Sequence, residues 1–265
     1  MSEAIDSIRL GYRLAKAAET TRIRIDHGLT SFARVYLTAW NPGADPKERK
    51  RHADKAREIV MAMLEGEIVD DKMADAIGPM IGNIAPSRLM LVETEKMHRK
   101  EVEKIVACLP AWKRIGQEVS GFSSWGMAVI IGEAGDIGEY SGCRKLYKRL
   151  GLAPDECYER GEDKNGRPGG RKIPRSRRGR IMGCVAEPLL RAQWRGERED
   201  APAHPIGPFG EVYGSVKARA LESGKTKGHA DKLARRAMVK ALLHDIHAAW
   251  HEHEFTYVKP EAVAA

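Results

Sequence analysis

Apolar side chains recur at helical rather than strand spacing along most of the 265-residue chain. Residues 1–41 have this pattern, which predicts one or two helices. The stretch NPGADP at 41–46 holds two prolines and a glycine, and it predicts a break. Asp45 followed by Pro46 is typical of a helix start, so another helix is expected from there to Leu64.

The most regular pattern predicts a long amphipathic helix at 86–118. Met90, Met97, Val102 and Leu109 fall at helical spacing, while Lys, Arg and Glu occupy the other faces. This arrangement is also typical of a coiled coil. The helix could therefore join copies of the chain into a homo-oligomer.

Residues 120–154 predict two helices separated by glycine-containing turns. After a turn at Gly121, the apolar run at 127–135 predicts a buried helix. A second helix is expected in CRKLYKRLGL, with Leu146 and Leu150 facing inward. Two helices beside tight glycine turns are the layout of a helix-hairpin-helix element, whose backbone N–H groups contact a phosphate.

The C-terminal part predicts three further helices. A basic amphipathic helix at 178–194 is expected to be interrupted at Pro188, and two more are joined by SGKTKG at 223–228. No segment shows convincing strand alternation, so the predicted fold class is all-α. The expected divisions are a helical segment of unknown role at 1–85, the amphipathic helix at 86–118, and a helical C-terminal domain at 119–265.

Composition narrows the class of protein. Hydrophobic residues make up 42% of the chain, and no run approaches the roughly 18 apolar residues that a membrane span needs. The N-terminus has no apolar signal-peptide core, so a cytoplasmic protein that does not contact membranes is expected. The four cysteines are far apart with no Cys-x-x-Cys pair, which favours free thiols over disulfides or a zinc site.

Positive charge is concentrated in one part of the chain. Residues 144–198 hold 16 Lys and Arg against 7 Asp and Glu, a surplus that exceeds the net charge of +8 for the whole chain. Seven of the basic residues lie between Arg167 and Arg180, where no acid occurs. A localised basic patch on a neutral body indicates nucleic-acid binding, and a role in solubility is the alternative.

Several stretches occur in an order that resembles a known family. They are GFS at 121–123, AVIIGEAGDIGEYSGCRKLYKRLGLAP at 128–154, RSRRGR at 175–180 and LESGKTKGHADKLARRAM at 221–238. About half of the chain resembles the C-terminal transposase domain of bridge-RNA-guided insertion-sequence transposases and Piv-type DNA invertases. The helix at 86–118 occupies the place of that family's coiled coil. The resemblance implies DNA, structured RNA or both as partners, and a role in DNA recombination and transposition of a mobile element.

Two departures from that family change the expected activity. The family's RuvC-like nuclease domain carries four metal-binding acids, and nothing before residue 86 resembles it. Asp6, Asp26 and the pair at 70–71 are not expected to bind metal. The family's reactive serine lies in a setting like YESG, whereas this chain has YERG with Arg160 at that position. Arginine has no hydroxyl and stays protonated, so no catalytic residue, metal or cofactor is predicted.

Other candidate chemistries are weaker. Ser176 matches a family serine that is expected to cap a helix or contact phosphate rather than attack it. His244, His247 and His251 share a helical face, but no carboxylate or cysteine completes a metal site. SGKTKG lacks the first glycine of a phosphate-binding loop, so nucleotide hydrolysis is excluded. A flexible turn and a phosphate contact remain equal alternatives for it.

Nucleic-acid binding without strand cleavage is the leading hypothesis. One alternative is the C-terminal half of a split transposase that works with a separate RuvC-like nuclease subunit. Another is an interaction protein whose basic surface neutralises an acidic partner. Nucleic-acid contacts are predicted in three regions, which are the turn at 121–123, the basic loop at 160–180 and a second group of lysines at 225–232. The predicted contact residues are Gly121, Ser123, Arg160, Arg167, Arg171, Lys172, Arg175, Ser176, Arg177, Arg178, Arg180, Lys225, Lys227 and Lys232.

Overall fold

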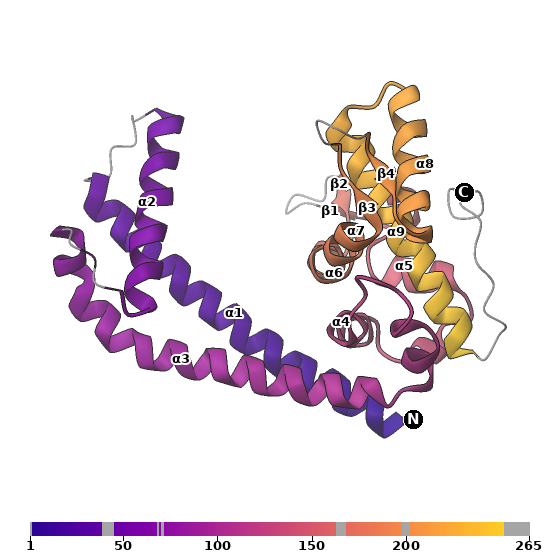
Figure 1. Ribbon diagram of the computed structural model, residues 1–265, viewed down its shortest axis with the longest axis horizontal. Coiled ribbons are helices and arrows are strands. Elements are labelled where there is room, and N and C mark those ends of the chain that lie inside the picture. The colour runs from indigo at the N-terminus through magenta and orange to yellow at the C-terminus, as the bar shows by residue number, and fades with distance from the viewer. Residues whose placement is uncertain are drawn as a thin grey trace. The chain divides into compact units, whose positions relative to one another are not determined.

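A computed structural model describes residues 2–38, 45–67, 69, 72–162, 168–197 and 202–251. The chain forms two compact units (Figure 1). Unit 1 comprises Met1–Tyr12 with Glu101–Ala265, and unit 2 comprises Arg13–Lys100. The fold is all-α, as the hydrophobic pattern predicts. The units do not divide the chain at the boundaries expected near residues 85 and 118.

Unit 2 is built from parts of two long helices and one shorter helix. These are α1 (Ser2–Thr38), α2 (Pro46–Leu64) and α3 (Lys72–Ala107). The start and end of α2 confirm the prediction made from Asp45, Pro46 and Leu64. Its apolar face buries Ala56, Ile59 and Val60 in a core that also contains Leu29, Ala33, Ile77 and Ile81.

Ion pairs fix α1 against α3 within unit 2. Arg22 lies 3.2 Å from Glu95, and Arg88 Nε donates to Asp26 Oδ1 at 2.6 Å. Because residues further along α1 pair with residues earlier in α3, the two helices run antiparallel (Figure 1).

The helix expected at 86–118 has different bounds. Helix α3 begins at Lys72, passes through Pro79 and Pro86, and ends at Ala107. Each proline removes one backbone donor, but Ile77 and Ile81 anchor this part of the helix in the unit 2 core. Pro110 disfavours helical backbone just before it, and the π-helical segment η1 (Trp112–Gly116) follows.

The apolar face expected for that helix is also partly wrong. Val102 and Leu109 are buried, but Met90 and Met97 are exposed by 72% and 49%. Oligomerisation through this helix therefore stays a prediction.

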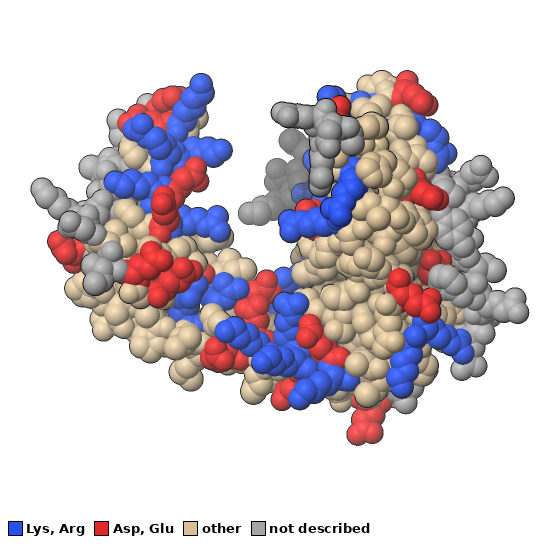
Figure 2. Space-filling view, viewed as in Figure 1, with Lys and Arg blue, Asp and Glu red and all other residues tan. Residues whose placement is uncertain are grey.

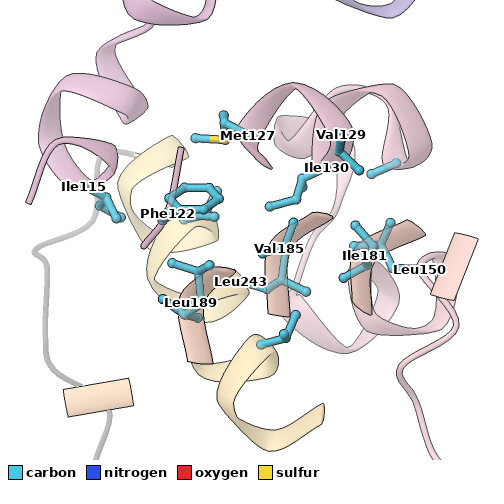
Figure 3. Close-up of a cluster of buried hydrophobic side chains, with 14 of the residues drawn as sticks. Ile115, Phe122, Met127, Val129, Ile130, Leu150, Ile181, Val185, Leu189 and Leu243 are labelled. Carbon is cyan, nitrogen blue, oxygen red and sulfur yellow. The ribbon is translucent and has the colours of Figure 1, made fainter. Parts of the chain in front are cut away.

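Unit 1 surrounds the helix α4 (Ser124–Ala134). This helix is apolar on all sides, and the residues from Gly126 to Ile131 are all buried. Figure 3 shows Ile130 of α4 pointing into a cluster with Val185 and Leu243. The buried helix predicted from MAVIIGEAG is confirmed. The remaining elements around it are the 3-10 turns η2 (Ile137–Glu139) and η3 (Asp155–Cys157), α5 (Cys143–Arg149), α6 (Arg175–Ile181), η4 (Met182–Ala186), α7 (Glu187–Gln193), α8 (Pro208–Glu222) and α9 (Lys227–Trp250).

Pro188 does not interrupt its helix. The helical path continues from α6 through the π-helical segment η4 into α7, where Pro188 is near the first position. The Glu187 N–H donates to Met182 O, five residues earlier in the chain. The turn just before the proline therefore contains one residue more than an α-helical turn. Pro188 follows this wider turn directly, as the second residue of α7.

Unit 1 also contains two short antiparallel pairs of strands that the sequence did not predict. Strand β1 (Arg160–Glu162) pairs with β2 (Pro168–Arg171), and β3 (Trp194–Arg195) pairs with β4 (His204–Pro205). The prediction of a loop at 160–180 is therefore wrong, because this segment begins with strands β1 and β2 and ends in helix α6.

Within the described ranges, no helix is both long and apolar enough to cross a membrane.

Candidate nucleic-acid interface

Two hydrogen bonds join the end of β2 and the residue after it to the two residues that precede β1. Arg171 Nη1 donates to Tyr158 O at 3.0 Å, and Lys172 N donates to Glu159 O at 2.9 Å. Pro174 then precedes the first residue of α6, Arg175. The basic segment is thus an ordered part of the fold at Arg171–Arg180.

The end of α5 lies against the start of α6. Gly151, which follows α5, has φ +77°, and a Cβ on it would lie 3.0 Å from Pro174 O and 3.1 Å from Arg178 Cβ. Only glycine accommodates both this backbone conformation and this approach. Tyr158 Oη also donates to Lys148 O at 3.2 Å. The C-terminal end of α5 is therefore next to the start of α6.

Five exposed cations lie on these segments, and we call them the unit 1 basic surface. They come from the last turn of α5, from β1, from the segment between β2 and α6, and from the first residue of α6. On the face shown in Figure 2, Lys and Arg side chains lie beside the β1–β2 hairpin. Exposed acids at 155–156 and at Glu159 offset part of the charge. The members of the unit 1 basic surface are Lys148, Arg149, Arg160, Lys172 and Arg175.

Other predicted contacts are engaged inside the protein. Arg177 Nε lies 3.7 Å from Oε2 of Glu133, a carboxylate that is only 7% exposed. Tyr12 Oη donates to Glu133 Oε1 at 2.5 Å. Burial and the Glu133 carboxylate raise the pKa of Tyr12, while Arg180 acts in the opposite direction, which places Arg180 in the same cluster. We conclude that Arg177 and Arg180 hold α6 against α4 and α1.

The half-buried Arg171 and Arg178 also have structural contacts, through Tyr158 O and Gly151 respectively. Ser176 is exposed, but Pro174 is the residue at the N-cap of α6, so the predicted capping role of Ser176 is wrong. Arg167 lies outside the described residues.

The turn at 121–123 has a structural explanation. Gly121 has φ +85°, and a Cβ on it would lie 2.5 Å from Ala192 Cβ and 2.7 Å from Pro188 O. Ser123 Oγ accepts the N–H of Gly126 at 3.1 Å and so caps α4. Both residue types follow from packing and capping, and the phosphate-binding hairpin stays a prediction.

A row of basic residues on α9 was only partly recognised from the sequence. Lys232 is exposed, and Arg236 and Lys240 follow at intervals of four residues along the same side of the helix. Lys240 Nζ lies 5.7 Å from the centre of the Tyr147 ring of α5. Burial lowers the pKa of Lys240, and nearby Arg236 adds to this effect. The four-residue spacing from Lys232 was the signal that could have identified Arg236 and Lys240.

The turn between α8 and α9 presents Lys225 and Lys227, both exposed. Thr226 caps α9, because its side-chain oxygen accepts the N–H of His229 at 3.4 Å. Two helices joined by SGKTKG are confirmed, and a phosphate contact at this turn stays a prediction.

His244 and His247 near the end of α9, and His251 at its C-cap, contact neighbouring groups within the protein. One ring nitrogen of His247, Nε2, lies 2.8 Å from Tyr140 O, and its ring is 4.3 Å from that of His251. His244 Nδ1 lies 3.5 Å from Oδ1 of the buried Asp245. Among the described residues, no group of three or more His, Cys, Asp or Glu side chains is placed to hold a metal ion.

Asp245 makes stability depend on pH. Burial raises the pKa of this 3% exposed carboxyl to about 7, well above the value of an unfolded chain. The neutral form therefore favours folding, and the stability it gives is lost as pH rises through 7. We expect the free energy of unfolding to fall by about 2 kcal/mol between pH 5 and pH 8 through this residue.

The measurement is urea denaturation at several pH values, with Asp245→Asn as the comparison. The asparagine cannot ionise, so its variant should lack this part of the pH dependence. Equal pH dependence of the two proteins would show that Asp245 does not titrate in this range. His244 is a neighbouring ionisable group, and burial lowers its pKa.

Comparison of this chain with protein-family models, with curated proteins and with solved structures found no match. The resemblance to the transposase family therefore stays a prediction.

Proposed function

We propose that this protein binds nucleic acid through the unit 1 basic surface and the row of basic residues on α9. The observation that carries the proposal is that five exposed cations, separated by up to 27 positions in the sequence, lie on segments that the contacts of Tyr158 and Gly151 bring next to one another. Such a surface suits the closely spaced phosphates of a nucleic acid.

Phosphate contacts from Lys and Arg would give affinity with little sequence preference. Arg160 is exposed on β1 and can pair with a phosphate, but it cannot attack one. On this proposal the protein holds a nucleic acid and does not cut it alone. The order of family-like stretches noted in the sequence supports a role in DNA transposition.

A salt titration tests this function. If about five or six cations each neutralise one phosphate, the slope of log K against log salt concentration should be roughly −5 for duplex DNA. Fluorescence anisotropy of labelled duplex DNA, single-stranded DNA and structured RNA, at 50 to 300 mM salt, would give both the slope and the preferred partner. Absence of binding to all three, or a flat salt dependence, would rule out the proposed function.

A further inference from the structure

A second concentration of positive charge lies on α2 of unit 2, outside the basic segment of unit 1. Residues 46–51 are exposed on every side of the helix, whereas Ala56, Ile59 and Val60 further along are buried. Four of these six residues are basic and one, Glu48, is acidic. On the face shown in Figure 2, Lys and Arg side chains project from α2. The cations Lys47, Arg49, Lys50 and Arg51 form what we call the α2 basic surface.

These four cations have no ion-pair partner among the described residues. Other basic residues of unit 2 behave differently, since Arg22 pairs with Glu95 and Arg88 pairs with Asp26. The charge of the α2 basic surface is therefore not used to hold unit 2 together.

Folding alone would favour other residues at these positions. The start of a helix carries partial positive charge, so acidic side chains stabilise it and basic ones destabilise it. None of the four cations contributes to the unit 2 core. Their side chains are thus costly to the helix and free to contact an external anion.

We propose that the α2 basic surface is a second site for nucleic-acid phosphates. This inference rests on the proposed function and adds unit 2 to the part of the protein that binds. A polyanion offers each of these closely spaced cations its own phosphate.

The composition of α2 favours nucleic acid over a membrane or a protein. A helix that lies on a membrane needs an exposed apolar face, but the apolar face of α2 packs in the core of its own unit. The exposed large apolar residues of unit 2 lie on α1 and α3. Protein interfaces are depleted of lysine and enriched in aromatic residues. Residues 46–51 hold two lysines and no aromatic residue.

Charge reversal in the full-length protein tests this site. The variant Lys47→Glu/Lys50→Glu/Arg51→Glu places acids at a helix start, where they are favourable, so it should fold as well as the parent protein. We expect it to bind duplex DNA at least about 10-fold more weakly at 100 mM salt, with a slope less negative by about 2 to 3. Anisotropy measures both values.

The matched control is Lys104→Glu/Lys113→Glu/Arg114→Glu. These residues are also exposed, and the control changes the net charge by the same amount outside both basic surfaces. Equal weakening in the two triple variants would overturn the proposal, because it would show an effect of net charge alone. Loss of binding to anionic vesicles or to polyglutamate, with DNA binding at the control level, would also overturn it.

A parallel variant separates this inference from the proposed function. If Lys172→Glu/Arg175→Glu weakens DNA binding and the α2 variant matches the control, the function stands and the second site does not. If the parent protein binds no nucleic acid, both proposals fail.

Discussion

The double variant Lys172→Glu/Arg175→Glu is expected to bind duplex DNA about 100-fold more weakly than the parent protein. Each substitution removes one charge-assisted contact with a phosphate and adds a repulsion, and each contact is worth about 1.5 kcal/mol. Lys172 and Arg175 are exposed and flank Pro174, which packs against Gly151 at the end of α5. Their loss divides the unit 1 basic surface.

The control for this variant is Lys113→Glu/Arg114→Glu, which changes the same charge at exposed positions of η1. Titrations with labelled DNA compare the two variants, and thermal unfolding checks that both remain folded. Similar affinities would show that DNA does not contact the start of α6.

Replacement of Glu133 is expected to destabilise unit 1 by about 3 kcal/mol. Glu133→Ala removes the buried acceptor of the Tyr12 hydroxyl and the carboxylate that faces Arg177. A buried polar group or charge without its partner costs more than the interaction itself contributes. Glu133→Gln should lose less, because its amide oxygen can still accept from Tyr12.

Urea denaturation measures these losses, with Glu118→Ala as the control at an exposed position of the same unit. Equal free energies of unfolding for Glu133→Ala and Glu118→Ala would contradict the structural role of the buried carboxylate. DNA binding by the folded Glu133→Gln protein should remain close to that of the parent.

Local patterns predicted much of the fold. Asp45, Pro46 and Leu64 marked the bounds of α2, and the inward positions of Leu146 and Leu150 on α5 are confirmed, since both are fully buried. These features depend on side chains within one helix or at its C-cap, where Leu150 follows α5, so their spacing is enough to predict them.

Features that depend on distant partners were not predicted. The arginines Arg177 and Arg180 resemble their exposed neighbours in sequence, and only the buried Glu133 of α4 gives them an inward role. Two prolines suggested helix boundaries that the structure does not have, a helix start at 86 and a helix break at 188. In both places the surrounding packing tolerates a missing backbone donor.

The π-helical segment η4 sets the rotational phase of the basic helix. An α-helix turns about 100° for each residue, so one residue added before Pro188 rotates everything on its N-terminal side by that amount relative to α7. With this offset, Leu189 of α7 is buried while Arg177 of α6 faces Glu133 and Arg175 faces solvent. The extra residue at η4 therefore determines which arginines of α6 face the interior and which face solvent.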